Sequence, residues 1–117
     1  MTVPHNRTSI KLSLLAELSH ASDSLGLYRA ELARILGLTC AEVSDANTLA
    51  SLLRRDHAVR ERAQRFVCFY RLLEQRFAHD SVAMVHWFRK PHAVLDTTPF
   101  LAIVDHARLD DVIAQLQ

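Results

Sequence analysis

The chain has 117 residues, which suffices for one folded domain but not for two, since a separate core usually needs about 100 residues. Half of the residues are hydrophobic, 23% are charged and the formal net charge is +1. These values exclude a disordered chain, a strongly basic nucleic-acid binder and an acidic tail protein. Two glycines and three prolines interrupt a sequence rich in leucine, alanine, arginine and glutamate, so we predict an all-α fold.

The sequence shows no sign of membrane insertion or export. No apolar run reaches the roughly 20 residues that a bilayer span requires, and residues 1–7 lack the apolar core of a signal peptide. Cys40 and Cys68 are far apart and form no CxxC motif, which is typical of two reduced thiols. We therefore predict a cytoplasmic protein that neither spans nor binds a membrane.

Three helices are predicted in the first half of the chain. Apolar residues recur at helical spacing over residues 10–25, and a shorter amphipathic helix follows over residues 28–36. A glycine comes directly after each of these helices, where it can supply a left-handed terminal residue. Thr39 is predicted to cap the third helix, because Glu42 follows it at the spacing of a capping box.

The longest helix is predicted from His57 to Ala78, with one apolar stripe opposite its charged positions. Phe69 and Leu72 widen this stripe beyond what one core face needs, so we expect a second subunit to cover part of it. A homodimer is therefore predicted. The seven arginines and three acidic residues over positions 54–76 are interpreted as a solvated helix face.

A helix over residues 82–90 is predicted to begin at Asp80 or Ser81 and to end before Pro91, because proline disfavours the helical conformation of its predecessor. Neighbouring side chains on this helix, Trp87 and Phe88, cannot both face the core to the same depth. Core packing is predicted for Trp87 and contact with a partner for the other ring.

The last third of the chain contains two further helix signals. Thr98-Pro99 is typical of a helix start, with threonine at the cap and proline in the first turn. Asp105 is predicted to cap a final helix whose apolar face lies within residues 109–116. Asp110 and Asp111 favour the N-terminal end of that helix, where the backbone dipole stabilises negative charge.

Residues 29–48 have the pattern of a helix-turn-helix with Gly37 in the turn. The two helices of this motif cross closely, which requires a small residue four positions before the glycine and an apolar one six positions after it. Ala33 and Val43 satisfy these requirements. The pattern also places four residues at inward positions: Leu32, Leu36, Leu38 and Ala46.

The second helix of this motif carries no arginine, lysine or glutamine that could read a base edge. Its Glu42 and Asp45 would face phosphates unfavourably, so a packing unit and a DNA reader both remain open. The residues that would contact DNA are Thr39, Ser44, Thr48, Arg54 and Arg55.

Residues 87–101, WFRKPHAVLDTTPFL, resemble the hallmark of the MbcA/ParS/Xre antitoxin toxin-binding family. In that family a helix ends in tryptophan, a basic residue and proline, and a short loop with a leucine leads to a Thr-Pro helix start. The resemblance covers residues 57–117 as a toxin-binding region, and the helix-turn-helix in residues 1–56 resembles the first half of the same antitoxins. His92 departs from the pattern, since asparagine is common there.

The resemblance implies an antitoxin that neutralises a RES-domain toxin, an enzyme that degrades NAD or transfers ADP-ribose from it. It also implies one compact unit in which the second region covers the toxin's cleft, while the helix-turn-helix represses the shared operon. The toxin-binding candidates are Trp87, Arg89, Lys90, Pro91, His92, Asp110, Asp111 and Gln117.

A cleft built for a pyrophosphate should be electropositive, so Asp110, Asp111 and the carboxylate at Gln117 are expected to present negative charge to it. Arg89 and Lys90 stay ambiguous, because the dipole at a helix C-terminus favours cations without any ligand.

Catalysis is not predicted. The chain has no GxSxG elbow and no glycine-rich phosphate loop, and two glycines would be unusual for an enzyme of this size. His79 and His86 can share a helix face, but no companion ligands follow, so neither a metal nor another cofactor is expected. The alternative function is a helix-turn-helix transcriptional regulator without a toxin partner.

Overall fold

The computed structural model describes the backbone of residues 3–117 and the side chains from Leu14 onward. Within that part of the chain all regular secondary structure is helical, which confirms the predicted all-α fold. In chain order the helices are α1 (Val3–Ser24), α2 (Arg29–Leu36), α3 (Cys40–Ser44), α4 (Ala46–Arg55), α5 (His57–Arg76), α6 (Ser81–Arg89), α7 (Pro99–Val104) and α8 (Leu109–Leu116).

Polar side chains begin several of these helices by accepting hydrogen bonds from backbone amides of the first turn. The predicted capping box is confirmed, since the Glu42 amide donates to Thr39 Oγ1 at 3.2 Å and the Thr39 amide donates to Glu42 Oε1 at 2.8 Å. Asp80 caps α6 and Thr98 caps α7 in the same way. These starts depend only on residues three positions apart, so the sequence pattern was sufficient to predict them.

The predicted length of the second helix of the helix-turn-helix is wrong. It ends at Ser44 after five residues, and Thr48 lies on α4 instead. Asp45 separates the two helices: its backbone is extended, and its carboxylate accepts from the amides of Asn47 at 3.0 Å and Thr48 at 3.4 Å. Aspartate favours such caps over helix interiors because its side chain competes for nearby backbone amides. Ala46, predicted to face inward, is consequently exposed.

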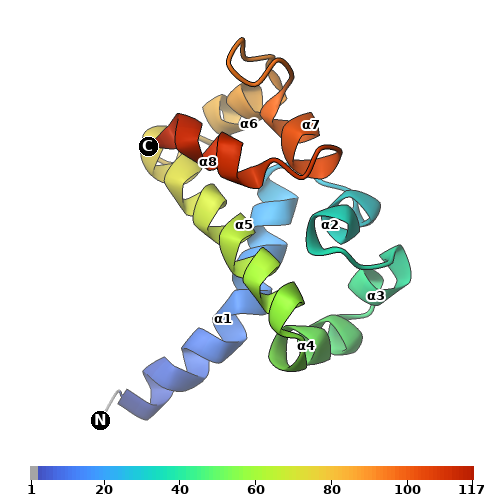
Figure 1. The fold of residues 1–117 in the computed structure, drawn as a ribbon. Coiled ribbons are helices and arrows are strands. Elements are labelled where there is room, and N and C mark those ends of the chain that lie inside the picture. The colour runs from blue at the N-terminus through green and yellow to red at the C-terminus, as the bar shows by residue number, and fades with distance from the viewer. Residues whose placement is uncertain (1–2) are drawn as a thin grey trace.

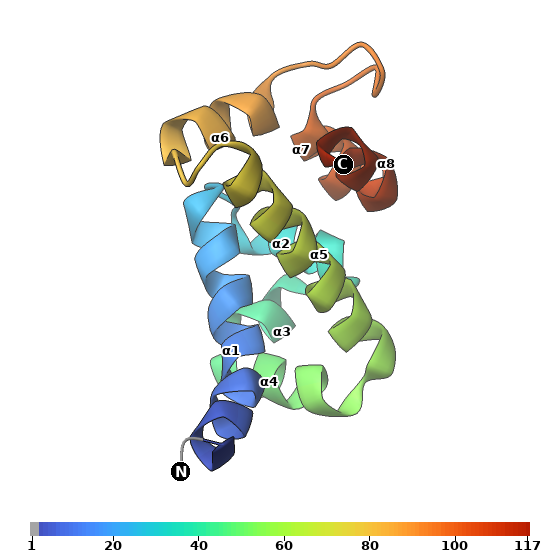
Figure 2. The same ribbon diagram turned by 90° about the vertical axis from the view of Figure 1, so that its left-hand side faces the viewer.

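Helix α5 is the central element of the molecule (Figure 1). Helix α1 crosses it, α8 packs beside its C-terminal half, and α4 lies at its N-terminal end. Figure 2 shows α6, α7 and α8 gathered at one end of the molecule, with α3 and α4 toward the other. Helix α2 connects the two ends, because it packs against both α3 and α7.

The apolar stripe of α5 is covered within one chain. Phe69 is fully buried, and its ring centroid lies 6.0 Å from those of Phe66 on α5 and Phe88 on α6. The expectation that a second subunit covers this side is therefore wrong for Phe69, because α6 folds back over it. Leu72 is half-buried against the same core. The buried members of the α5 stripe are Val59, Ala63, Phe66, Val67, Phe69, Tyr70 and Leu73.

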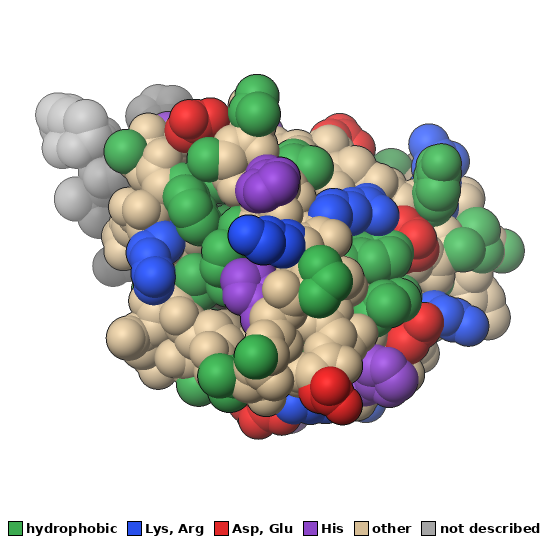
Figure 3. Space-filling model, turned by 90° about the horizontal axis from the view of Figure 1, so that it is seen from above, with side chains coloured by type: hydrophobic (Ala, Val, Ile, Leu, Met, Phe, Trp, Pro, Cys, Tyr) green, Lys and Arg blue, Asp and Glu red, His purple; other side chains and the backbone are tan. Residues whose placement is uncertain are grey.

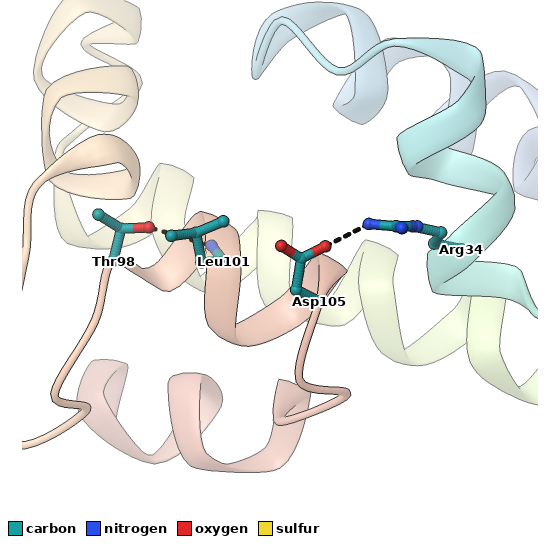
Figure 4. A network of polar contacts seen from close by, with 4 residues as sticks. All are labelled: Arg34, Thr98, Leu101 and Asp105. Carbon is teal, nitrogen blue, oxygen red and sulfur yellow. Dashed lines mark hydrogen bonds and ion pairs between the residues drawn. The ribbon is translucent and has the colours of Figure 1, made fainter.

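Asp105 does not cap the last helix as predicted. It lies at the C-terminal end of α7 and forms an ion pair with Arg34 on α2, as Figure 4 shows. Helix α8 begins four residues later, after a turn in which Ala107 has a φ of +52°. The carboxylate of Asp105 is thus used in a long-range contact between two helices.

Candidate functional site

The end of α6 carries the aromatic residues that the sequence singled out. Phe88 is fully buried, whereas Trp87 is half-buried with its ring centroid 6.3 Å from Phe77 and 4.9 Å from His92. The prediction that Trp87 is the core residue of the pair is therefore wrong. Phe88 takes the inward position, where its ring packs between the tilted ring of Phe69 and the edge-to-face ring of Phe100.

Arg89 is engaged within the chain. Its Nη2 donates to the carbonyl oxygens of Leu25 at 3.3 Å and Gly26 at 3.2 Å, just beyond the end of α1. Its guanidinium also lies 4.1 Å from the ring centroid of Phe100, a cation–π distance. The neighbouring Lys90 is exposed and forms no ion pair with any residue of the 14–117 region. Both cations are exposed, but among the described residues only Arg89 is engaged in contacts within the chain.

Residues 91–97 form a compact loop between α6 and α7. His92 and Thr97 pair across its base, where the His92 amide donates to the Thr97 carbonyl at 3.0 Å. The His92 ring is half-buried, with Nε2 at 3.1 Å from the carbonyl oxygen of Trp87. Pro91 is exposed beside it. Trp87 and His92 are in contact, and Pro91 lies between them in the chain at this end of the molecule.

The carboxylates predicted on α8 are present in its first turn, and each has an arginine neighbour. Asp110 forms an ion pair with Arg65 of α5, and Asp111 accepts from Arg108 Nε at 2.9 Å. Both side chains remain largely exposed. Gln117 is exposed at the far end of α8. The negative charge expected of this helix is therefore partly neutralised by its own chain.

The DNA-contact candidates do not share one helix. Thr39 is occupied in its cap, and the hydroxyl of Ser44 faces the thiol of Cys40 at 3.9 Å. Thr48 and Arg55 lie on α4, where Arg55 Nε donates to the Ser51 hydroxyl at 3.1 Å. The prediction that one DNA-reading helix carries Thr39, Ser44 and Thr48 is therefore wrong. The Asp45 cap ends α3 at Ser44 and starts α4, which carries Thr48.

The surplus arginines over positions 54–76 are not simply solvated. Arg62 Nη1 donates to the carbonyl of Leu36 at 3.2 Å, and Arg60 Nη1 donates to that of Arg54 at 2.7 Å. Arg71 forms an ion pair with Glu17. Six of the seven arginines are exposed, as expected of a solvated face, but several of them also contact helix ends or carboxylates of the same chain.

The structure also brings in residues that sequence reasoning missed. Val94 is 74% exposed at the loop tip, while Leu95 beside it is buried. Arg108 Nη1 donates to the Leu95 carbonyl at 2.8 Å and so ties the loop to the start of α8. The only sequence signal was the leucine of the loop pattern. Nothing local indicated its arginine partner, which is 13 positions away.

Figure 3 looks onto the end of the molecule that carries α6 and this loop. Hydrophobic side chains lie there beside histidine, lysine or arginine side chains, and most of the acidic groups lie toward the edges of the view. The face is therefore mixed apolar and basic in character.

A shallow pocket of about 290 Å³ lies elsewhere, between α1 and α5. Its polar groups contact one another: Glu17 pairs with Arg71, and His20 Nε2 lies 3.4 Å from the hydroxyl of Tyr70.

The prediction that His79 and His86 share a helix face is wrong, because His79 lies in the turn before α6.

Within residues 14–117, no group of three or more His, Cys, Asp or Glu side chains could hold a metal ion. None of the helices described is long and apolar enough to cross a membrane. No protein-family model matches the sequence, and no curated protein matches it either. The interpretation of the site therefore depends on its own residues and geometry.

Proposed function

We propose that this protein is a cytoplasmic antitoxin of a type II toxin–antitoxin system, which binds a RES-domain toxin and prevents it from degrading NAD or transferring ADP-ribose. The observation that carries the proposal is the segment over residues 87–101. It forms the end of α6, a compact loop and the Thr98-Pro99 start of α7, in the order that the antitoxin resemblance implies. The antitoxin catalyses nothing and acts by occupying the toxin's surface.

The contacts within this segment divide its residues into two roles. Arg89 attaches the segment to the carbonyls that follow α1, and His92 holds the loop against the carbonyl of Trp87. Lys90 and Pro91 are exposed beside them and face a partner. Trp87 has both roles, since its ring is half-buried between Phe77 and His92 and keeps one part accessible.

Helix α8 contributes negative charge to the proposed interface. Asp110 and Asp111 are exposed, but an approaching electropositive cleft has to compete with Arg65 and Arg108 for their carboxylates. Such exchange of one ion pair for another gives specificity more than affinity. Gln117 is exposed at the opposite end of the helix.

The proposal is tested by co-expression with the product of the adjacent reading frame, with a tag on this protein only. The expected result is a stable complex, normal growth, and a cellular NAD level restored to that of cells without the toxin. A toxic neighbour that is neither captured nor silenced would contradict the proposal.

A charge exchange tests the role of α8 separately. If Asp110 faces the toxin's cleft, Asp110→Lys weakens inhibition, and the double variant Asp110→Lys with Arg65→Glu does not restore it. If Asp110 only stabilises the fold through Arg65, the double variant restores inhibition because the ion pair is rebuilt with reversed polarity. Unchanged inhibition by Asp110→Lys and Asp111→Lys together would remove α8 from the interface.

A DNA-binding regulator is the second candidate, and exposed arginines favour it. Arg54 and Arg55 are exposed in the last turn of α4, at the end of the molecule opposite the loop (Figure 1). The short α3 with Glu42 opposes base reading, so phosphate contacts would dominate. Binding of upstream promoter DNA that weakens steeply as salt rises would support this candidate, and salt-insensitive toxin binding without DNA binding would exclude it.

A further inference from the structure

We infer that the pocket between α1 and α5 binds a small organic cation, in which an ammonium group is carried on an aromatic body. None of the residues that line this pocket belongs to the segment over residues 87–101 or to α8. The inference therefore goes beyond the proposed antitoxin function and does not depend on it. The cavity is called the α1–α5 pocket below.

The α1–α5 pocket has the size and lining of a site for a small molecule. Its volume of about 290 Å³ is close to the lower end of the range that ligand pockets occupy in proteins. Val67 and Tyr70 of α5 are buried and supply apolar surface. Ala16 of α1 lines the same space with a single methyl group. The small side chain at this position thus leaves room that a longer one would fill.

Two aromatic side chains line the pocket and hold each other in place. His20 of α1 and Tyr70 of α5 meet edge to face, with ring centroids 5.7 Å apart and planes at 85°. His20 Nε2 also lies 3.4 Å from the hydroxyl of Tyr70. Aromatic rings attract organic cations and pack well against other rings. The pair therefore offers a ligand an aromatic surface that is already ordered.

The charged side chains that line the pocket are two carboxylates, Glu17 and Glu74, and one guanidinium, Arg71. Glu17 and Arg71 form an ion pair with each other. Glu74 is only 25% exposed, and within residues 14–117 its one ionic neighbour is His79 Nδ1, at 3.5 Å. The His79 side chain is 74% exposed and lies outside the pocket, so this long contact is weak. Glu74 is therefore the carboxylate that a ligand can use.

These groups together select the charge of the ligand. An ammonium group beside Glu74 gains a charge-assisted hydrogen bond, while the body of the ligand covers Val67 and the ring of Tyr70. An anion of the same size would bring its charge close to Glu74 and would have to displace Glu17 from Arg71. The α1–α5 pocket is therefore complementary to a cation and opposes an anion.

Two probes that differ only in the charge of one end test this preference on the full-length protein. Phenethylamine carries an ammonium group on a two-carbon stem, and 3-phenylpropionate carries a carboxylate on the same stem and ring. Titrations followed by the backbone amide signals in ¹H–¹⁵N NMR give both affinities and locate the site. Phenethylamine is expected to bind with a Kd on the order of 1 mM, and 3-phenylpropionate at least about tenfold more weakly.

Matched variants test the residues. Glu74→Gln is expected to weaken phenethylamine binding by at least about fivefold, because it removes the charge that the ammonium contacts. Glu61→Gln makes the same change at an exposed position of α5 outside the pocket, and its effect is expected to be below about twofold. Ala16→Phe fills the cavity and should weaken binding by at least about tenfold, with Ala114→Phe on the exposed face of α8 as its control.

The outcomes support or overturn the inference without any toxin in the assay. Equal affinity for the two probes, or equal effects of Glu74→Gln and Glu61→Gln, would overturn the cation site. Signals that shift only at residues away from the pocket would overturn it as well. An unchanged circular dichroism spectrum shows that each variant is folded. None of these results bears on capture of a RES-domain toxin, so the proposed function and the α1–α5 pocket stand or fail separately.

Discussion

Several arginine side chains in this protein donate hydrogen bonds to backbone carbonyls at the ends of helices. Arg89 reaches the carbonyls that follow α1, and Arg62 reaches that of Leu36 in the last turn of α2. The last carbonyls of a helix have no partner within it and carry partial negative charge. A guanidinium with five donors can satisfy several of them while its stem covers apolar surface. The local arginine excess is in this way part of the fold.

Replacing Arg89 tests this role. Arg89→Ala is expected to lower the free energy of unfolding by about 1 to 2 kcal/mol, because it removes two charge-assisted hydrogen bonds and the contact with Phe100. Lys90→Ala is the neighbouring control and should change stability by less than about 0.5 kcal/mol. Urea denaturation followed by circular dichroism measures both. Equal effects of the two changes would contradict a structural role specific to Arg89.

The two glycines offer a second test at the residue scale. Gly26 and Gly37 both have left-handed backbones, with φ of +70° and +72°, so alanine is strained at either position. A Cβ at Gly37 would also lie 2.7 Å from Arg62 Nη1, whereas a Cβ at Gly26 would lie 3.8 Å from Arg89 Nη2.

Gly37→Ala is therefore expected to cost about 1 kcal/mol more than Gly26→Ala, the value of the displaced Arg62 hydrogen bond. In an Arg62→Ala background this difference should vanish, because the displaced group is gone. Unfolding free energies of the five variants complete the comparison. A difference that persists without Arg62 would show that the strain lies in the backbone alone.

At the scale of elements, short polar caps decide where helices stop. Asp45 ends α3 and begins α4, and Asp56 caps α5 in the same manner by accepting from Ala58 and Val59. The chain can turn at each of these residues without a glycine, because one carboxylate satisfies two amides of the next helix. The cap at Asp45 explains why the predicted second helix of the helix-turn-helix is divided into α3 and α4.

Asp45→Ala is expected to reduce stability by about 1 kcal/mol, the usual value of an N-cap aspartate. Asn47→Ala, in the first turn of the same helix, is the matched control and should have an effect below about 0.5 kcal/mol, since its exposed side chain caps nothing. Chemical denaturation of both variants checks the prediction. A loss from Asn47→Ala as large as that from Asp45→Ala would assign the effect to the turn rather than to the cap.

At the scale of the whole molecule, one apolar core includes residues from α1 to α8. Phe66, Phe69, Phe88 and Phe100 form a continuous series of ring contacts through α5, α6 and α7. Arg34 and Asp105 join α2 to α7 on the surface. Helix α5 packs against α1, α2 and α4 of residues 1–56 as well as α6 and α8 of residues 57–117, so the two regions share one core.

Cooperative unfolding is the expected consequence. Circular dichroism reports on all helices, while the fluorescence of the only tryptophan, Trp87, reports on the α6 end. Both signals should give one midpoint in urea, since neither half keeps a core without α5. Two separate midpoints would show that the regions before and after residue 56 unfold independently.

The same fold shows how far local sequence patterns carry. The helix starts at Thr39, Asp80 and Thr98 and the glycine stops follow from interactions within about four residues, and they were predicted from the sequence alone. Helix α5 begins at His57 as predicted but ends at Arg76, two residues before the predicted end at Ala78. The sequence also predicted a helix that ends before Pro91, a loop after it, and a new helix that starts at Thr98-Pro99. These features depend on residues that are close in sequence, so they can be predicted without knowing how the helices pack.

Tertiary structure alone decided which groups meet. Arg89 contacts Leu25 across 64 positions, and Arg34 pairs with Asp105 across 71. Phe88 rather than Trp87 is the core residue because the rings of Phe69 and Phe100 pack around it. Arg108 holds the loop that exposes Val94 by donating to the carbonyl of Leu95. Such contacts depend on how helices pack, and a periodic pattern indicates which face of a helix is apolar without indicating what covers it.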